Sequence, residues 1–274
     1  MKQIKINLTS KFITKIPLSD TCKSILLGSI LGDGSLNIHK GSKNARFKMR
    51  HSIIQKDYFD WKASSLTEIS TPKSVMIQSA DGFSPNRRSA KFFYQSSACP
   101  PLTQLYKATH CRNELRIRRR WLNHMTPLSL AIWWLDDGSI ISDGKKGVIC
   151  TDGFDEKSVK LLARYLEKVW NVHARARPVA QLRRKTSDEA AAAQQQVAIY
   201  YRLWLSTEQL KKFLRIILSH IPVPSMLSKV ILLYKNPKLQ QRWISEVKQK
   251  LPHFSKQVGV EYVNKRQKWR DFRK

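Results

Sequence analysis

The sequence predicts an α+β protein made of two pseudo-symmetric halves, and three observations lead to that prediction. An apolar run of helical length ends in Asp-Gly-Ser twice, as ILLGSILGDGS at residues 25–35 and as SLAIWWLDDGS at residues 129–139. The elements expected after each run follow in the same order. Helical and period-two apolar patterns alternate along 274 residues, enough chain for one large domain or two ordinary ones. An internal repeat is therefore the simplest organisation.

The first half is expected to run helix, strand pair, helix, strand pair, helix. Ser19 or Asp20 caps a helix that ends near Gly32. Residues 45–53 alternate apolar with basic or polar side chains, which predicts a strand whose core face includes Ile53. The other elements of this half are expected at residues 56–69 (helix), 73–79 and 91–96 (strands joined by a polar turn) and 100–110 (helix).

The second half repeats this order. Thr126 followed by Pro127 is a typical helix start, and that helix is expected to run through Asp137. Ser206 opens a packing helix, with Gln209 in the capping-box position. The other elements are expected at residues 139–151 (strands), 155–169 (helix), 173–185 and 197–205 (strands), 237–250 (helix) and 252–274 (basic tail).

A basic segment near residues 112–125 is expected to join the halves. The N-terminal half then covers residues 1–120, and the C-terminal half, with its basic tail, covers residues 121–274. The stretch SDEAAAAQQQ reads as an exposed tip. The start, MKQIKINLTSKFITKIP, fits either a basic arm on nucleic acid or a transit peptide, although transit peptides favour Arg and this stretch has none.

The formal charge of +30 is far from that of a generic soluble enzyme, and it is spread along the whole chain. Such an excess is typical of a protein that holds a polyanion, and nucleic acid is the strongest candidate. A membrane surface is the alternative, but no basic amphipathic helix stands out and no apolar run approaches the roughly 20 residues of a membrane span. The four cysteines form no CxxC pair, which argues against a zinc finger or disulfide framework and fits a reducing compartment.

The two motif helices are expected to pack on each other. Gly28 and Gly32 stand four residues apart, a spacing that lets another helix approach closely. Packing the two copies about a pseudo-two-fold axis would bring Asp33 and Asp137 together at the negative ends of the helix dipoles. Two carboxylates so placed repel each other, and a divalent cation, Mg²⁺ or another such as Mn²⁺, would resolve that repulsion.

Paired acids, a metal and basic strands point to phosphodiester hydrolysis, with each acid serving one strand of a duplex. Each feature alone has an ordinary explanation. An Asp-Gly pair usually marks a turn, a small-xxx-small spacing usually marks packing, and a run of charges is usually a solvated face. The hypothesis depends on their coincidence in two copies.

At these residues the chain resembles the LAGLIDADG homing endonucleases, specifically the intron-encoded monomers with two motifs. The nine-residue signature falls on Leu26–Gly34 and Leu130–Gly138. The resemblance implies two αββαββα halves, an antiparallel β saddle over the DNA, and motif helices packed at the interface. It also implies metal-dependent cutting of a long, asymmetric double-stranded site that leaves short 3′ overhangs.

The resemblance also nominates catalytic residues. The last acid of each motif, Asp33 and Asp137, is the catalytic one. The residue before it can offer a backbone carbonyl to the metal, which names Gly32 and Asp136. A supporting basic residue is expected near the end of each half. The remaining nominations are Lys229 in the second half, Arg116 or a neighbour within ELRIRRRW in the first, and Ser52 near the metal-bound water.

Basic strand faces are expected to read the DNA in the major groove. The candidates are Arg46, Lys48, Arg50, Ser52, Arg87, Arg88, Lys91, Arg175, Arg177, Arg183 and Arg202. Ile132 stands where the first copy has Gly28, so the helix interface should be small against large.

Two further classes of function remain in view. One is an RNA-binding maturase that assists splicing of its host intron, with or without cleavage, which would make intron RNA a second partner. The other is a general basic binder of DNA, which leaves the duplicated motif unexplained. Intact acids in both motifs favour the enzyme. An organellar location, mitochondrial or chloroplast, and no membrane partner are expected.

Overall fold

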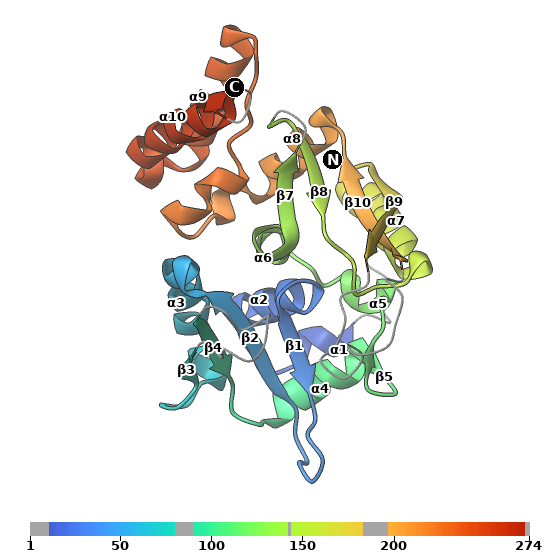
Figure 1. The fold of residues 1–274 in the computed structure, drawn as a ribbon. Helices are drawn as coiled ribbons and strands as arrows, with labels where there is room; N and C mark the ends of the chain where they lie inside the picture. The colour runs from blue at the N-terminus through green and yellow to red at the C-terminus, as the bar shows by residue number, and fades with distance from the viewer. Residues whose placement is uncertain (1–10, 80–89, 142–143, 183–196, 272–274) are drawn as a thin grey trace. The chain divides into compact units, whose positions relative to one another are not determined.

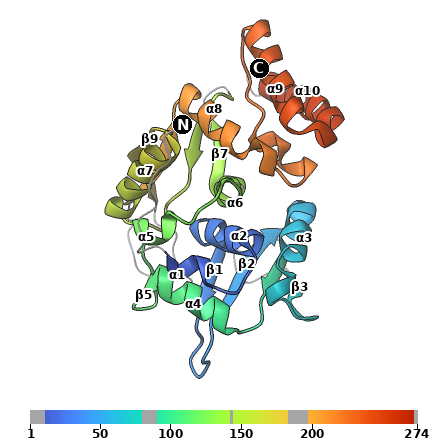
Figure 2. The ribbon, with the colours of Figure 1, turned by 180° about the vertical axis from the view of Figure 1, so that it is seen from behind.

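The computed structural model describes residues 11–79, 90–141, 144–182 and 197–271 (Figures 1 and 2). The chain divides into two compact units. Unit 1 comprises the described residues of 1–78, 91–136 and 220–225, and unit 2 those of 79–90, 137–219 and 226–274. The boundary passes between Asp136 and Asp137, so these adjacent aspartates belong to different units. The expected division near residue 120 stays a prediction.

The described part of unit 1 begins with a short helix and the first motif helix, and it includes the second motif helix as far as Asp136. Ser19 caps the first motif helix as predicted, since its side chain accepts a hydrogen bond from the Cys22 N–H at 3.1 Å. The elements are α1 (Lys11–Thr14), α2 (Asp20–Leu31), β1 (Gly34–Asn37), β2 (Arg46–Ser52), η2 (Ile53–Gln55), α3 (Lys56–Ser64), η3 (Thr67–Ile69), β3 (Val75–Gln78), β4 (Lys91–Gln95), α4 (Pro100–Thr109), β5 (His110–Cys111), β6 (Glu114–Leu115), α5 (Arg119–Leu122) and α6 (Pro127–Asp137).

The long central stretch of unit 2 begins at Asp137, the last residue of the second motif helix. Ser206 caps its helix by accepting from the Gln209 N–H, while the Gln209 side chain accepts from the His173 N–H instead of closing a capping box. The elements from here to the C-terminal end of the described chain are β7 (Gly138–Ile141), β8 (Lys146–Ile149), α7 (Glu156–Trp170), β9 (Ala174–Leu182), β10 (Val197–Leu205), α8 (Thr207–Ile217), η6 (Leu218–His220), η7 (Pro224–Lys229), α9 (Pro237–Lys250), η8 (Pro252–Phe254) and α10 (Ser255–Asp271). Residues 220–225, which include parts of η6 and η7, belong to unit 1.

The two units contain four-stranded antiparallel sheets of the same topology. The strand order is β1-β2-β4-β3 in unit 1 and β7-β8-β10-β9 in unit 2. The first strand of each sheet starts at the glycine of an Asp-Gly pair. The predicted α+β fold with an internal repeat is therefore confirmed.

The motif helices α2 and α6 pack side by side within unit 1 (Figures 1 and 2). A Cβ atom on Gly28 would lie 2.4 Å from the Ser129 carbonyl oxygen and 2.7 Å from the Ile132 Cβ. The Thr126 hydroxyl, which also caps α6, donates to the Ser24 hydroxyl at 2.8 Å. The expected contact of a small residue with a large one is confirmed.

Two local predictions in unit 1 were wrong. The helix expected over residues 56–69 ends at Ser64 and is followed by a 3-10 turn. The strand expected to reach Ile53 ends at Ser52, and Ile53 is 46% exposed in η2. His51 is instead the last buried residue of the strand, at 3% exposure.

The basic tail expected after residue 252 is a 17-residue helix, α10, that packs against α9. Val258 is fully buried, and Lys265 donates to the Ser228 and Ile231 carbonyl oxygens at 2.6 and 2.8 Å. Val258, Tyr262 and Lys265 have a helical spacing in the sequence, but the many charged residues around them hid this pattern and the helix was not predicted. Within the described residues, no helix is long and apolar enough to cross a bilayer.

Candidate functional site

The first motif helix ends so that Asp33 follows its C-terminus. Gly32 caps α2, and its N–H donates to the Ser29 carbonyl at 3.0 Å. A Cβ atom on Gly34 would lie 2.7 Å from the Phe47 ring, so the residue after the acid has to be small. The Asp33 side chain is 42% exposed and can therefore meet a ligand from solvent.

The side chain of Asp136 lies across this helix end, and it is fully buried. Its carboxylate accepts from the Lys62 ammonium at 3.0 and 3.1 Å, from the Tyr58 hydroxyl at 2.8 Å and from the Asp33 N–H at 3.3 Å. A Cβ atom on Gly32 would lie 2.5 Å from the Asp136 Cβ. Asp136 thus fills the space that Gly32 leaves open.

His51 connects this buried group with Asp33. Its Nε2 lies 3.5 Å from the Lys62 Nζ, and its Nδ1 lies 3.8 Å from a carboxylate oxygen of Asp33. A lysine ammonium only donates hydrogen bonds, so Nε2 is the acceptor and Nδ1 carries the proton of the neutral ring. The ring packs edge-on against Tyr58 and Phe59, which fixes its plane.

Burial decides the electrostatics of this cluster. The Lys62 and Asp136 side chains are both fully buried, so each charge depends on the other for compensation. Burial, followed by the negative charges of Asp136 and Asp33, raises the pKa of Tyr58 well above its ordinary value. Tyr58 therefore stays a neutral hydroxyl donor.

Asp33, His51 and Asp136 offer possible metal-ligand atoms that all lie within 4.8 Å of one another. Both oxygens of Asp136 already accept from Lys62. A cation bound by that side chain would therefore meet a buried ammonium at hydrogen-bond distance. The half-exposed carboxylate of Asp33 has the oxygen chemistry that hard divalent cations prefer and fits such an ion better.

Asp137 begins unit 2, and its carbonyl accepts from the Cys150 N–H at 3.1 Å. Burial raises the pKa of the Cys150 thiol, and the charge of Asp137 raises it further, whereas Arg202 and Lys229 lower it. Asp137 and Lys229 therefore lie within electrostatic range of one thiol. Arg116, the counterpart nominated in the first half, forms an ion pair with Glu114 at 2.7 Å.

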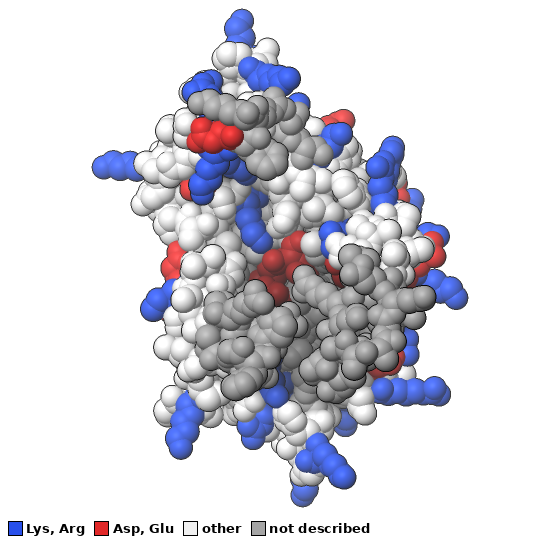
Figure 3. Space-filling model, in the orientation of Figure 1, with Lys and Arg blue, Asp and Glu red and all other residues white. Residues whose placement is uncertain are grey.

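The basic candidates of unit 1 lie on β2 and β4. Arg50 is exposed and stacks over Phe93, with 5.0 Å between the guanidinium and the ring centroid. Partial burial and the neighbouring Arg50 and Arg46 lower the pKa of Lys48. Ser52 and Lys91 are cross-strand partners. These residues place several cations on one sheet, and Figure 3 shows Lys and Arg distributed over the face in view.

The basic candidates of unit 2 lie on β9 and β10. Arg175 and Arg177 are exposed, and Arg177 lies over the Trp204 ring at 5.9 Å. Arg202 differs, because its guanidinium forms two hydrogen bonds with Asp152, at 2.7 and 2.5 Å, which neutralise it. Arg87, Arg88 and Arg183 fall outside the described residues, as do the expected tips around residues 80–89 and 187–196.

The sequence did not identify the residues that hold Asp136 in place. Lys62 reads as a solvated helix charge, although it lies four residues after the apolar Tyr58 and on the same helix face. His51 occupies an apolar position in the alternation of β2, and that exception was the available signal.

Comparisons with known proteins agree with this architecture. "Protein RecA" of Mycobacterium gastri is 33% identical over 175 residues, which cover 58% of this chain and 39% of that protein. "Cytochrome b mRNA maturase bI2" of Saccharomyces cerevisiae (strain ATCC 204508 / S288c) is 27% identical over 164 residues, or 57% of this chain and 38% of the maturase. The chain thus spans about two fifths of these relatives.

Among solved structures, the homing endonuclease I-WcaI bound to its DNA recognition sequence has a similar fold. The TM-score is 0.62 at 17% sequence identity, with 85% of this chain and 96% of that chain covered. Residues 23–213, which include both Asp-Gly motifs and both four-stranded sheets, match the sequence pattern of one family. The chain belongs to the LAGLIDADG DNA endonuclease family.

Proposed function

We propose that this chain is a site-specific endonuclease of intron origin that acts as a monomer and cuts both strands of duplex DNA. The observation that carries the proposal is the pair of Asp-Gly helix ends, each followed by a sheet of the same strand order with basic side chains. Family membership and a fold similar to that of a DNA-bound homing endonuclease support it.

In this proposal, Asp33 and Asp137 hold a divalent cation, Mg²⁺ or Mn²⁺, with help from the Gly32 and Asp136 carbonyl oxygens. The bound ion would supply Lewis-acid chemistry to phosphodiester hydrolysis. Both oxygens of the Asp136 side chain accept from Lys62, and one also accepts from the Asp33 N–H, so Asp136 positions the backbone of the first acid.

The remaining residues have supporting roles. The Nδ1 atom of His51 lies 3.8 Å from a carboxylate oxygen of Asp33 and is proposed to orient that side chain. Lys229, Arg116 and Ser52 are proposed to complete the site around the scissile phosphate. Of the two basic residues, Lys229 is the better supported, because its charge and that of Asp137 reach the same Cys150 thiol.

The decisive experiment selects cleavable sites from a randomised DNA library and then cuts a plasmid that carries the selected site. Asp33→Asn and Asp137→Asn should each abolish double-strand cleavage, a loss of about a thousandfold or more in rate, while DNA affinity stays largely intact. Asp60→Asn, which removes an exposed carboxylate on α3, is the matched control and should cut normally. Full cutting by either acid variant would overturn the assigned roles, and sequencing the ends tests the proposed 3′ overhangs.

DNA affinity should fall steeply with salt concentration, because phosphate contacts release counterions. Arg50→Gln or Arg177→Gln should reduce the slope of log K against log salt by about one each. Arg202→Gln should change it less, since Asp152 already neutralises that guanidinium. Affinity that is insensitive to salt would contradict the proposed surface.

A second candidate is an intron maturase, favoured by the similarity to "Cytochrome b mRNA maturase bI2". That similarity also supports the proposal of an organellar location. Splicing help does not require the acids, so Asp33→Asn should leave it unchanged. A splicing assay with the host intron RNA separates the two activities, since the endonuclease loses cutting in the same variant.

A further inference from the structure

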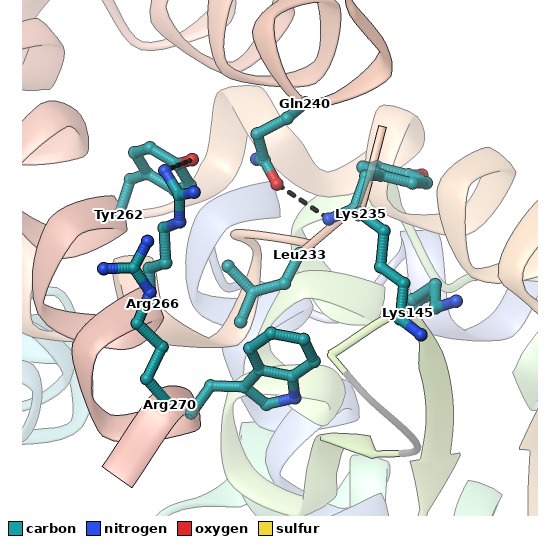
Figure 4. Close-up of a pocket in the computed structure, with 9 residues that line it drawn as sticks. Lys145, Leu233, Lys235, Gln240, Tyr262, Arg266 and Arg270 are labelled. Carbon is teal, nitrogen blue, oxygen red and sulfur yellow. Dashed lines mark hydrogen bonds between the residues drawn. The ribbon is translucent and has the colours of Figure 1, made fainter. Parts of the chain in front are cut away.

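A pocket of about 340 Å³ lies in unit 2, away from the strands β9 and β10. Its lining comes from the β7–β8 hairpin, the segment before α9, α9 itself and α10. Figure 4 shows Arg266 and Arg270 on one side, Lys145 and Lys235 on the other, and Leu233 between them. The volume is at the small end of the range for ligand pockets, about 300–1,000 Å³, and suits one nucleotide-sized group.

The base of this pocket is held by hydrogen bonds from three elements. The Leu233 N–H donates to the Gly144 carbonyl at 2.8 Å, which ties the hairpin to the segment before α9. The Gln240 side chain accepts from the Tyr234 N–H at 2.7 Å (Figure 4). It also donates to the Leu232 carbonyl at 3.0 Å. The pocket is therefore largely formed before a ligand arrives.

The wall formed by α10 is fixed by Lys265. Its ammonium is buried and donates to one carbonyl oxygen of η7, that of Ser228, and to one of the segment that follows, that of Ile231. This anchor sets the rotation of the helix, so that Tyr262, Arg266, Trp269 and Arg270 line the pocket. The Tyr262 hydroxyl accepts from Arg266 at 3.3 Å.

The lining is strongly cationic. Lys145, Lys235, Arg266 and Arg270 contribute four positive charges, and no carboxylate of the described residues forms an ion pair with any of them. Three aromatic residues, Tyr234, Tyr262 and Trp269, also line the pocket, and each is partly exposed. Cations for phosphates combined with rings for stacking are typical of single-strand binding sites.

We propose that this pocket binds one nucleotide of a single-stranded nucleic acid, with the base against Trp269 and the flanking phosphates on the four cations. A duplex keeps its bases stacked inside and presents none that could enter. Cutting a duplex does not require such a site, so this inference goes beyond the proposed endonuclease. RNA and DNA share the recognised chemistry, and the test below separates them.

The test uses the full chain and fluorescence anisotropy with short labelled oligo(U), oligo(dT) and a labelled duplex. The double variant Arg266→Gln with Arg270→Gln loses two phosphate contacts, and the variant Trp269→Leu loses one stacked base. Each variant should bind single strands about fivefold more weakly or worse, which is the smallest loss expected for such a change. Duplex affinity and duplex cutting should change by less than about twofold in both variants. Tighter binding of oligo(U) or of oligo(dT) identifies RNA or DNA as the ligand.

The matched control is Lys256→Gln with Lys268→Gln, which removes two exposed charges from the same helix but none from the pocket lining. If this control weakens single-strand binding as much as the arginine pair does, the effect comes from the overall charge of the helix and the proposal is overturned. An unchanged Trp269→Leu variant would also overturn it, as would competition by inorganic phosphate as strong as by a mononucleotide. The arginine side chains are exposed, so their replacement leaves the fold in place.

Discussion

The two Asp-Gly motif ends look alike in sequence and have different surroundings. In unit 1, Asp33 lies beside a fully buried polar group formed by Lys62, Asp136 and Tyr58. In unit 2, the surroundings of Asp137 include the half-buried Cys150 and a part-exposed ion pair, Arg202–Asp152. The repeat thus preserves the acid while the groups around it diverge.

Steric exclusion explains part of this difference. Gly32 and Asp136 occupy the same position in their motifs, and a Cβ atom at Gly32 would lie 2.5 Å from that of Asp136. Only one of the two positions can therefore carry a side chain. The side chain that is present becomes buried and requires Lys62 as a partner. Close packing of two repeated helices makes them unequal.

The largest expected change in stability comes from breaking the buried Lys62–Asp136 pair of unit 1. Lys62→Met leaves the Asp136 carboxylate buried without compensation and should lower the free energy of unfolding by about 3–5 kcal/mol. Arg202→Met, which breaks the part-exposed pair in unit 2, should cost about 1 kcal/mol or less. Denaturant titrations of both variants measure the contrast.

A double-mutant cycle sharpens the same point. Lys62→Met with Asp136→Asn removes both charges, so its cost should be smaller than the sum of the two single costs. Additive costs, or equal costs for Lys62→Met and Arg202→Met, would contradict the buried pair.

The next effect compares two buried lysines. Unlike Lys62, Lys265 is held by carbonyl oxygens, and burial lowers its pKa from 10.5 to about 8. Below pH 8 both the folded and unfolded states hold this proton, and burial of the charge destabilises the fold. As the pH rises from 8 to 10.5 only the folded state loses the proton, so the folded state gains stability.

The stability of the wild type relative to Lys265→Met should therefore increase over this interval, by about 3 kcal/mol in total. Denaturant midpoints of both proteins across the pH range check this. A difference that stays constant would mean that water reaches the ammonium.

The smallest expected change in stability comes from disturbing the close packing of α2 against α6. Gly28→Ala places a Cβ atom against the Ser129 carbonyl and the Ile132 side chain and should cost about 1–3 kcal/mol. Gly153→Ala, in unit 2, meets no atom within 4 Å and should change stability by less than about 0.5 kcal/mol. Thermal unfolding compares them, and equal shifts would argue against the close approach of α2 and α6.

Much of the fold could be predicted from the sequence because it depends on local patterns. Ser19 and Thr126 cap helices where their sequence neighbours indicate. The strand expected at residues 197–205 and the helix expected at residues 237–250 have those bounds in the structure. The helix α10 was missed because its few apolar positions stand among many charges, and its burial depends on the distant carbonyls that Lys265 reaches.

The sequence by itself determined the repeat, the two acids at helix ends and the excess of positive charge, because each is a property of neighbouring residues or of composition. Tertiary structure alone decided that Asp136 meets Lys62, 74 residues away, and that it occupies the space left by Gly32. It also decided that Arg202 is neutralised and that α10 forms one wall of a cationic pocket. A side chain's protonation and partners depend on burial, which follows from contacts between segments far apart in the sequence.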